Sequence, residues 1–272
     1  MITQTKRYPP RWSVLTIGVA MGLALAAWAP VRAADEATEA LSPSARDWSF
    51  SGPLGVFDRA ALQRGYQLYR EVCSACHSLE FIAFRNLADP GGPEFSEEAV
   101  KALAAEHSVQ DGPDEFGEMF DRPGRLSDYL PSPYLNNNEA RAANGGSLPP
   151  DLSVIIKART NGPNYLYALL TGYEDPPADF ELADMMNYNP YFSGRQIAMA
   201  PQLFEGLVEY SDGTEASVAQ MAKDLVQFLT WTAEPKLEER KALAVPVLIY
   251  MLILTILLYA SYKRIWRDVD HD

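Results

Sequence analysis

A five-residue motif, Cys73-Ser-Ala-Cys-His77, constrains this chain more than any other feature of its sequence. Its C-x-x-C-H spacing is the one by which a polypeptide attaches a c-type haem. On a helical turn, residues three apart project from one face, so both sulfurs can reach the vinyl groups of one porphyrin while the imidazole of His77 turns toward the iron. Cys73 and Cys76 are the only cysteines, so attachment would leave none for a disulfide. We predict one covalently bound haem c per chain.

The same cysteines have two alternative interpretations, a thioredoxin-like dithiol and half of a zinc site. A redox dithiol is expected near a βαβ pattern, and a zinc site needs a second pair of Cys or His ligands at matching spacing. The sequence contains neither pattern, so the haem interpretation is favoured.

The N-terminal segment 1–33 is typical of a secretory signal peptide. Lys6, Arg7 and Arg11 precede an uncharged apolar run from Val14 to Trp28, and small residues at 33–34 suit cleavage. A retained membrane anchor is the alternative, but 15 apolar residues are short for a span of about 20. The segment is not rich in Ser and Arg as a mitochondrial presequence would be, so we expect export to a bacterial periplasm.

A second apolar run, Leu243–Tyr262, has 20 residues without a charge. At about 1.5 Å per residue it is long enough to cross about 30 Å of hydrocarbon, so we expect a transmembrane helix rather than a buried core helix. Basic residues number three on each side and do not orient it. Because a signal peptide exports what precedes the span, we expect a single-pass protein of the bacterial inner membrane with a cytoplasmic tail at 263–272. Pro246 is expected in the first turn, where a missing N–H is tolerated.

The remaining segment, 34–242, is predicted to be one periplasmic haem domain. Residues 1–33 carry four basic and no acidic residues, so their removal would take the formal charge from −13 to −17. Such a domain is a poor nucleic-acid binder and a plausible partner for a basic protein. The acids gather at 94–121 and 174–184, which are either docking surfaces or simply solvated loops.

The predicted fold is mainly α, with long loop insertions. Apolar periodicity predicts helices at 59–72, 96–106, 151–160, 164–171 and 218–232, with Ser96 as an N-cap, and little alternates as a strand should. The segment 89–150 is rich in Pro, Gly and Asn and is expected to consist mostly of loops.

The sixth iron ligand must come from elsewhere in the chain. A thioether or a second imidazole makes an electron-transfer haem, whereas an open site permits ligand binding or peroxide chemistry. Met199 lies on a Pro-bounded loop that could present its sulfur, and spacing alone leaves Met185 and Met186 open. Bis-histidine ligation would need His107, and Met221 sits on an amphipathic helix as core residues do.

Taken together, several segments resemble the cytochrome c1 family of the ubiquinol to cytochrome c oxidoreductase, the bc1 complex. The resemblance covers nearly all of the exported domain and the anchor. It is carried by Cys73–Ser78, Ala142–Leu152, Asn164–Tyr173, Asn189–Phe192, Ile197–Pro201 and Trp231–Pro235. It implies a cytochrome c-like helix pair, in which Gly65 and Tyr69 of the first helix meet Phe228 and Trp231 of the last.

The resemblance also implies roles for particular residues. Met199 takes the position of the axial methionine opposite His77, so that these two residues ligate the iron. Some bacterial members carry an extra cysteine pair that braces the haem pocket. This chain has none, so its methionine loop is expected to be held by packing alone.

Five further residues take positions around the haem of the family. Arg159 and Tyr165 correspond to contacts of a haem propionate, while Asn144, Pro149 and Pro150 correspond to the loop lining the pocket. Without the resemblance, Arg159 would be an exposed residue at a helix end and the two prolines a turn.

The implied function is single-electron transfer from a Rieske iron-sulfur protein to a soluble or tethered cytochrome c. The partners would be cytochrome b, the Rieske protein and cytochrome c, in a dimeric multisubunit membrane complex that oxidises quinol. The chain itself would be an electron carrier without catalytic residues. A free-standing tethered carrier and a haem peroxidase are the rival functions, and a peroxidase would need an open sixth site and usually a second haem motif.

Overall fold

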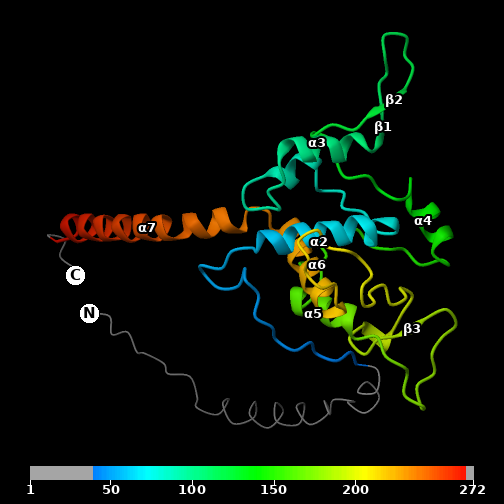
Figure 1. The fold of residues 1–272 in the computed structure, drawn as a ribbon. Helices are drawn as coiled ribbons and strands as arrows, with labels where there is room; N and C mark the ends of the chain where they lie inside the picture. The colour runs from blue at the N-terminus through cyan, green and yellow to red at the C-terminus, as the bar shows by residue number, and fades with distance from the viewer. Residues whose placement is uncertain (1–38, 268–272) are drawn as a thin grey trace, which may run out of the picture. The chain divides into compact units, whose positions relative to one another are not determined.

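The computed structural model describes residues 39–267 of the 272, and the chain from Ala40 onward forms one unit (Figure 1). The predicted signal peptide at 1–33 and the last residues of the predicted tail lie outside the described residues. The described part is mostly helical with few strands, as predicted. In chain order its longer helices are α2 (Arg59–Glu71), α3 (Glu97–Ala105), α4 (Asn137–Ala143), α5 (Gly162–Thr171), α6 (Val218–Ala233) and α7 (Leu237–Ile265).

The core forms where α2 packs on α6, and α5 packs on α6 in turn (Figure 1). Both helices of the pair begin at a side-chain cap: Asp58 accepts from the Ala61 N–H and Ser217 from the Gln220 N–H. These bonds satisfy amide groups that have no partner within the helix.

Close approach of α2 and α6 depends on Gly65. A Cβ at this position would lie 2.3 Å from the Asp224 carbonyl oxygen and 2.6 Å from the Phe228 Cβ. Tyr66 and Tyr69 pack their rings on Phe228, with centroids 5.7 and 6.1 Å apart. Gly65 and Tyr69 therefore meet Phe228 as predicted, while the Trp231 ring packs on Phe228, with centroids 5.7 Å apart, and against Gly92.

A buried ion pair also joins the two helices. Arg64 Nε donates to Asp224 Oδ2 over 2.8 Å, and the Asp224 side chain is fully buried. The second carboxylate oxygen accepts from Arg64 Nη2 and from Gln220 Nε2, both at 3.0 Å. Because these bonds satisfy the buried charge, breaking the pair would leave an uncompensated carboxylate in the core.

The insertion between α2 and α5 is more ordered than its composition predicts. The short helix η2 (Phe84–Ala88) and α3 are followed by an antiparallel hairpin of β1 (Ser108–Asp111) and β2 (Phe120–Pro123), in which Ser108 pairs with Pro123. The sequence analysis predicted neither the hairpin nor α4. The hairpin strands are mostly exposed and polar, so the apolar alternation of a half-buried strand is missing.

Two other predictions were wrong in their local structure. Residues 151–160 form turns rather than a helix, because the side chains of Asp151 and Ser153 bond the backbone near 78–81 and compete with helix formation. The C-terminal helix begins at Leu237 rather than 243, so Pro246 lies inside α7 and not in its first turn. The predicted span itself is part of this long apolar helix, whose most apolar stretch is not buried against the protein.

Candidate functional site

The attachment segment, residues 73–81, continues the chain directly from α2. The 3₁₀ turn η1 (Cys73–Ala75) closes through bonds from the Cys76 and His77 amides to the Cys73 carbonyl, at 3.1 and 2.9 Å. Cys73 opens this turn and Cys76 is its C-cap, so the two cysteines stand at the two ends of one turn. The turn therefore keeps the two cysteines and His77 close together along the chain.

His77 is oriented by the backbone of a distant loop. Its Nδ1 lies 2.7 Å from the Pro150 carbonyl oxygen, which can only accept, so Nδ1 carries the proton and Nε2 is the nitrogen left to ligate a metal. Burial lowers the pKa of His77, while the Pro150 carbonyl and the Asp151 carboxylate oppose this shift. The Tyr69 hydroxyl donates to the His77 carbonyl over 3.0 Å and ties the turn back to α2.

Asp151 joins the loop carrying Pro150 to the attachment segment. Its Oδ2 accepts from the Ser78 hydroxyl at 2.9 Å and from the Glu80 amide at 2.8 Å, and its Oδ1 accepts from the Ser153 amide at 2.9 Å. The Leu152 amide also donates to the Ser78 carbonyl, at 2.9 Å. This network keeps Pro150 beside His77, and the sequence analysis did not identify Asp151 as part of it.

The environment of Cys73 differs from that of a reactive dithiol. Burial is the largest effect on Cys73 and raises the pKa of its thiol to about 12, with a smaller contribution from Cys76. Reactive dithiols depend on lowered thiol pKa values. Two cysteines on one turn, beside an imidazole with a free Nε2, instead fit the donor set for covalent haem, with Cys73 and Cys76 as attachment points and His77 as a ligand.

The segment 187–201, here called the methionine loop, carries Met199. Its strands β3 (Asn187–Tyr188) and β4 (Gln196–Ile197) pair antiparallel around the 3₁₀ turn η3 (Ser193–Arg195). Met199 follows β4 by two residues, and its carbonyl accepts from the Tyr173 hydroxyl over 2.9 Å. The expectation that packing alone holds this loop was therefore wrong, because hydrogen bonds hold it as well.

Arg159 and Tyr165 lie near each other, and their contact with a haem propionate stays a prediction. Burial raises the pKa of the half-buried Tyr165, and the nearby positive charge of Arg159 partly offsets this shift. Arg159 also donates to the Ala158 carbonyl at 3.0 Å and is exposed. Tyr165 lies close enough to Tyr173 to contribute to the raised pKa of that hydroxyl, for which burial is the main cause. Arg159, Tyr165 and Tyr173 therefore form a series of neighbours, and the last of them hydrogen-bonds the methionine loop.

Asn144 occupies a different setting. It ends α4, and its side-chain amide donates to the Tyr134 hydroxyl at 3.0 Å and to the Ala140 carbonyl at 2.7 Å. The contacts of Asn144 place it at the start of the loop that leads to Pro149 and Pro150. Its role at a haem pocket stays a prediction.

The other ligand candidates have varied environments. Met221 is fully buried in the core, as its helical spacing indicated. His107 packs on the Phe84 ring, with centroids 5.6 Å apart, beside α3. Met185 is exposed, and its Cε would lie 2.9 Å from a Cβ on Gly145. Among the described contacts, none joins Met185, Met221 or His107 to the attachment segment, so none of them is favoured as an iron ligand.

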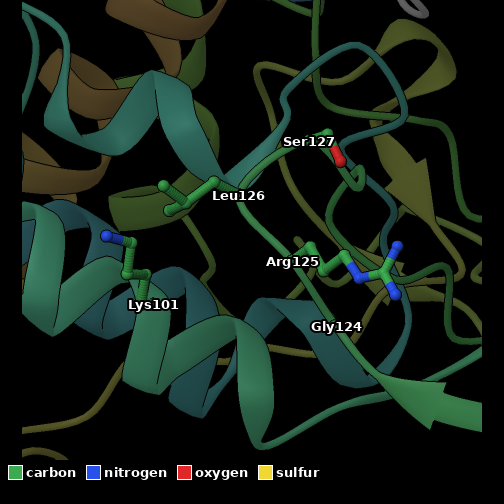
Figure 2. A pocket seen from close by; sticks show the side chains of 5 residues that line it. All are labelled: Lys101, Gly124, Arg125, Leu126 and Ser127. Atoms are coloured by element: carbon green, nitrogen blue, oxygen red, sulfur yellow. The ribbon is translucent and has the colours of Figure 1, made fainter.

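Two surface pockets lie on the insertion. One has a volume of about 440 Å³ and is lined by Lys101, Gly124, Arg125, Leu126 and Ser127 (Figure 2). In Figure 2 the Lys101 ammonium and the Arg125 guanidinium point to opposite sides, so they do not converge on one ligand. The second, of about 530 Å³, includes Phe84 and His107. Neither pocket shares a residue with the attachment segment or the methionine loop.

The sequence analysis singled out neither Tyr173 nor Asp151, although both hydrogen-bond the backbone of a candidate segment. Tyr173 stands within one of the segments that carry the family resemblance, Asn164–Tyr173, but no spacing rule marks an aromatic residue just after a helix as a partner of a loop 26 residues away. Only the folded chain shows this contact.

The family model and the relatives that match this chain all carry the name of one family. The model of the "Cytochrome C1 family" matches residues 48–269. "Cytochrome c1" of Rhodospirillum rubrum is 44% identical over 270 residues, which cover 93% of this chain and 97% of the relative. "Cytochrome c1-2, heme protein, mitochondrial" of Solanum tuberosum is 50% identical, covering 89% and 91%. "Cytochrome b/c1" of Bradyrhizobium diazoefficiens is 46% identical over 83% of this chain and 36% of the relative.

Proposed function

This chain belongs to the cytochrome c1 family, the electron-carrying haem subunits of bc1 complexes, and we propose that it passes single electrons from a Rieske iron-sulfur protein to a cytochrome c. The observation that carries this proposal is the hydrogen bond between His77 Nδ1 and the Pro150 carbonyl, beside two cysteines on one 3₁₀ turn. It leaves one imidazole nitrogen available as an axial ligand.

Haem bound at Cys73 and Cys76 supplies a one-electron iron couple. The chain's own residues keep the coordination constant: His77 is held by Pro150, and Met199 is the proposed sixth ligand. A thioether ligand raises the reduction potential of such a site relative to two imidazoles. Fixed ligands leave little to reorganise on electron transfer, and the chain needs no catalytic residue.

Association with cytochrome b in a dimeric, quinol-oxidising complex follows from the family and from the fused Bradyrhizobium relative, whose name combines the two cytochromes. Single-pass insertion by α7, with the haem domain in the periplasm, completes this proposal. Detergent extraction of a tagged full-length chain tests it. Co-purification of b-type haem with quinol-dependent cytochrome c reduction supports the complex, whereas a lone c-type haem from membranes with an intact complex would identify a free-standing carrier.

The acidic segment 174–184 is the better placed of the two acidic segments for docking a basic cytochrome c. It begins directly after Tyr173, and the Ala183 amide donates to Gln196 Oε1 in the methionine loop over 3.0 Å. Opposite charge at this position would raise the association rate of a basic partner. The acids of the hairpin turn at 111–121 belong to the insertion instead.

Matched charge changes test this docking surface. The triple variant Glu174→Gln, Asp175→Asn and Asp179→Asn should slow cytochrome c reduction at low ionic strength and weaken its salt dependence. The control neutralises three exposed hairpin acids: Glu115→Gln, Glu118→Gln and Asp121→Asn. Equal effects of both variants would mean that overall charge, and not this surface, sets the rate.

Carbon monoxide binding to the reduced chain tests the rival peroxidase function. A six-coordinate carrier should bind it poorly, and rapid binding would support an open sixth site.

A further inference from the structure

The C-terminal end of α5 holds the start of the methionine loop. Asn189 is fully buried, and its side-chain amide donates to the Leu169 carbonyl over 2.8 Å. Two residues later the Tyr191 ring packs against Gly172, where a Cβ would lie 2.6 Å from two ring carbons. Both contacts involve the last residues of α5 and its C-cap. These two contacts therefore fix the first part of the methionine loop against the C-terminal end of α5.

The end of the loop returns to the same place. Tyr173 directly follows the C-cap Gly172, and its hydroxyl donates to the Met199 carbonyl over 2.9 Å. Because a carbonyl oxygen can only accept, the hydroxyl is the donor in this bond. Between these attachments the loop bends through Gly194 and Arg195, which both have positive φ angles of 75° and 56°.

A hydrogen bond at this carbonyl acts on the direction of the side chain. It restrains the backbone at Met199, and the direction of the Cα–Cβ bond follows from that backbone. A thioether is a neutral, weak ligand on a flexible side chain, so its contact with iron depends on how narrowly the backbone directs it.

We propose that Tyr173 is a positioning residue for Met199: its hydroxyl holds the Met199 carbonyl and directs the thioether toward the iron. The inference rests on the proposed role of Met199 as a ligand. Tyr173 would act through the backbone of the loop and not as a ligand itself.

The test is Tyr173→Phe in the full-length, haem-loaded protein, which removes one hydroxyl and keeps the ring. Two readouts report the methionine bond: the thioether-to-iron charge-transfer band of the oxidised form, and the rate of carbon monoxide binding to the reduced form. We expect a weaker band and a rate about three- to tenfold higher, as the loss of one hydrogen bond predicts. Tyr210→Phe is the matched control, because its buried hydroxyl has no hydrogen-bond partner among the described residues.

The variant Met199→Leu distinguishes a failure of the ligand role of Met199 from a failure of the positioning role of Tyr173. If Met199→Leu abolishes the band while Tyr173→Phe behaves like Tyr210→Phe, the positioning role is wrong and the ligand role stands. If Met199→Leu leaves the band intact, the ligand assignment fails and the inference fails with it. Equal changes in both tyrosine variants would indicate a general loosening of the fold and would also overturn the inference.

Discussion

The attachment segment and the methionine loop are held in place by different kinds of contact. The attachment segment has three predicted haem contacts within five residues, on a turn that continues α2, and the charged Asp151 pins it through its carboxylate. The methionine loop presents one residue on irregular backbone, and the neutral hydroxyl of Tyr173 holds it. Hydrogen bonds to charged groups are about twice as strong as neutral ones. The comparison indicates a rigid histidine side and a more easily loosened methionine side.

The largest expected effect distinguishes the residues that attach the haem covalently from the residue that ligates its iron. The double variant Cys73→Ala with Cys76→Ala should lose all haem that survives denaturing electrophoresis, because no thioether bond can form. Met199→Leu should keep that haem, because its effect is confined to the sixth ligand. Haem staining of the gel measures both. Covalent haem in the double cysteine variant would contradict the assignment of the attachment site.

The next largest effect concerns the contact of α2 with α6, on which the stability of the whole haem domain is expected to depend. Gly65→Ala should lower the free energy of unfolding by about 3 kcal/mol, because the added Cβ meets the Asp224 backbone at 2.3 Å. Chemical denaturation of the haem-loaded chain measures this loss. Gly213→Ala is the control: its Cβ meets nothing within 4 Å, and only its positive φ opposes the change, at a cost of about 1 kcal/mol. Equal losses would show that α2 and α6 tolerate separation.

A third variant compares the two sides directly. Asp151→Asn should cost about 2 kcal/mol of stability, because the carboxylate accepts at both oxygens, from Ser78 and Glu80 at Oδ2 and from Ser153 at Oδ1, whereas an amide has only one accepting oxygen. Tyr173→Phe should cost about 1 kcal/mol, the value of one neutral hydrogen bond. Urea denaturation of both haem-loaded variants measures the difference. A larger loss for Tyr173→Phe would reverse the comparison.

The smallest effect concerns a charged pair that belongs to neither side. Arg122 Nη1 donates to Asp128 Oδ2 over 2.6 Å at the base of the hairpin. Hydrogen bonding from Arg122 is the main reason that the pKa of Asp128 is lowered to about 2. Because this pKa is below the unfolded value, the pair stabilises the fold above about pH 4 and loses its effect as the pH falls toward 2.

Asp128→Asn should therefore cost about 1 kcal/mol at pH 7 and almost nothing near pH 2. Unfolding followed as a function of pH measures this convergence with the wild type. The charge-transfer band and the covalent haem should be unchanged at pH 7. A changed band would mean that the hairpin and the methionine loop are coupled.

The accuracy of the sequence predictions followed the type of contact that each element makes. Helices α2, α5 and α6 were predicted within about two residues of their ends, because they bury regular apolar faces. The hairpin was missed because its strands are exposed and lack that regularity. Residues 151–160 were predicted as a helix, since nothing in their spacing indicates that Asp151 bonds a segment more than 70 residues away.

The candidate site shows the same division. By itself, the sequence predicted the attachment chemistry, because covalent haem binding needs two cysteines and a histidine at fixed local spacing, and it determined the apolar length of the candidate span. Tertiary structure alone decided which carbonyl orients His77, which carboxylate holds that carbonyl in place, and which hydroxyl restrains Met199. These contacts join residues 26 to 73 positions apart, and the hydrogen-bonding groups are common ones whose partners are set only when α2, α5 and α6 pack together.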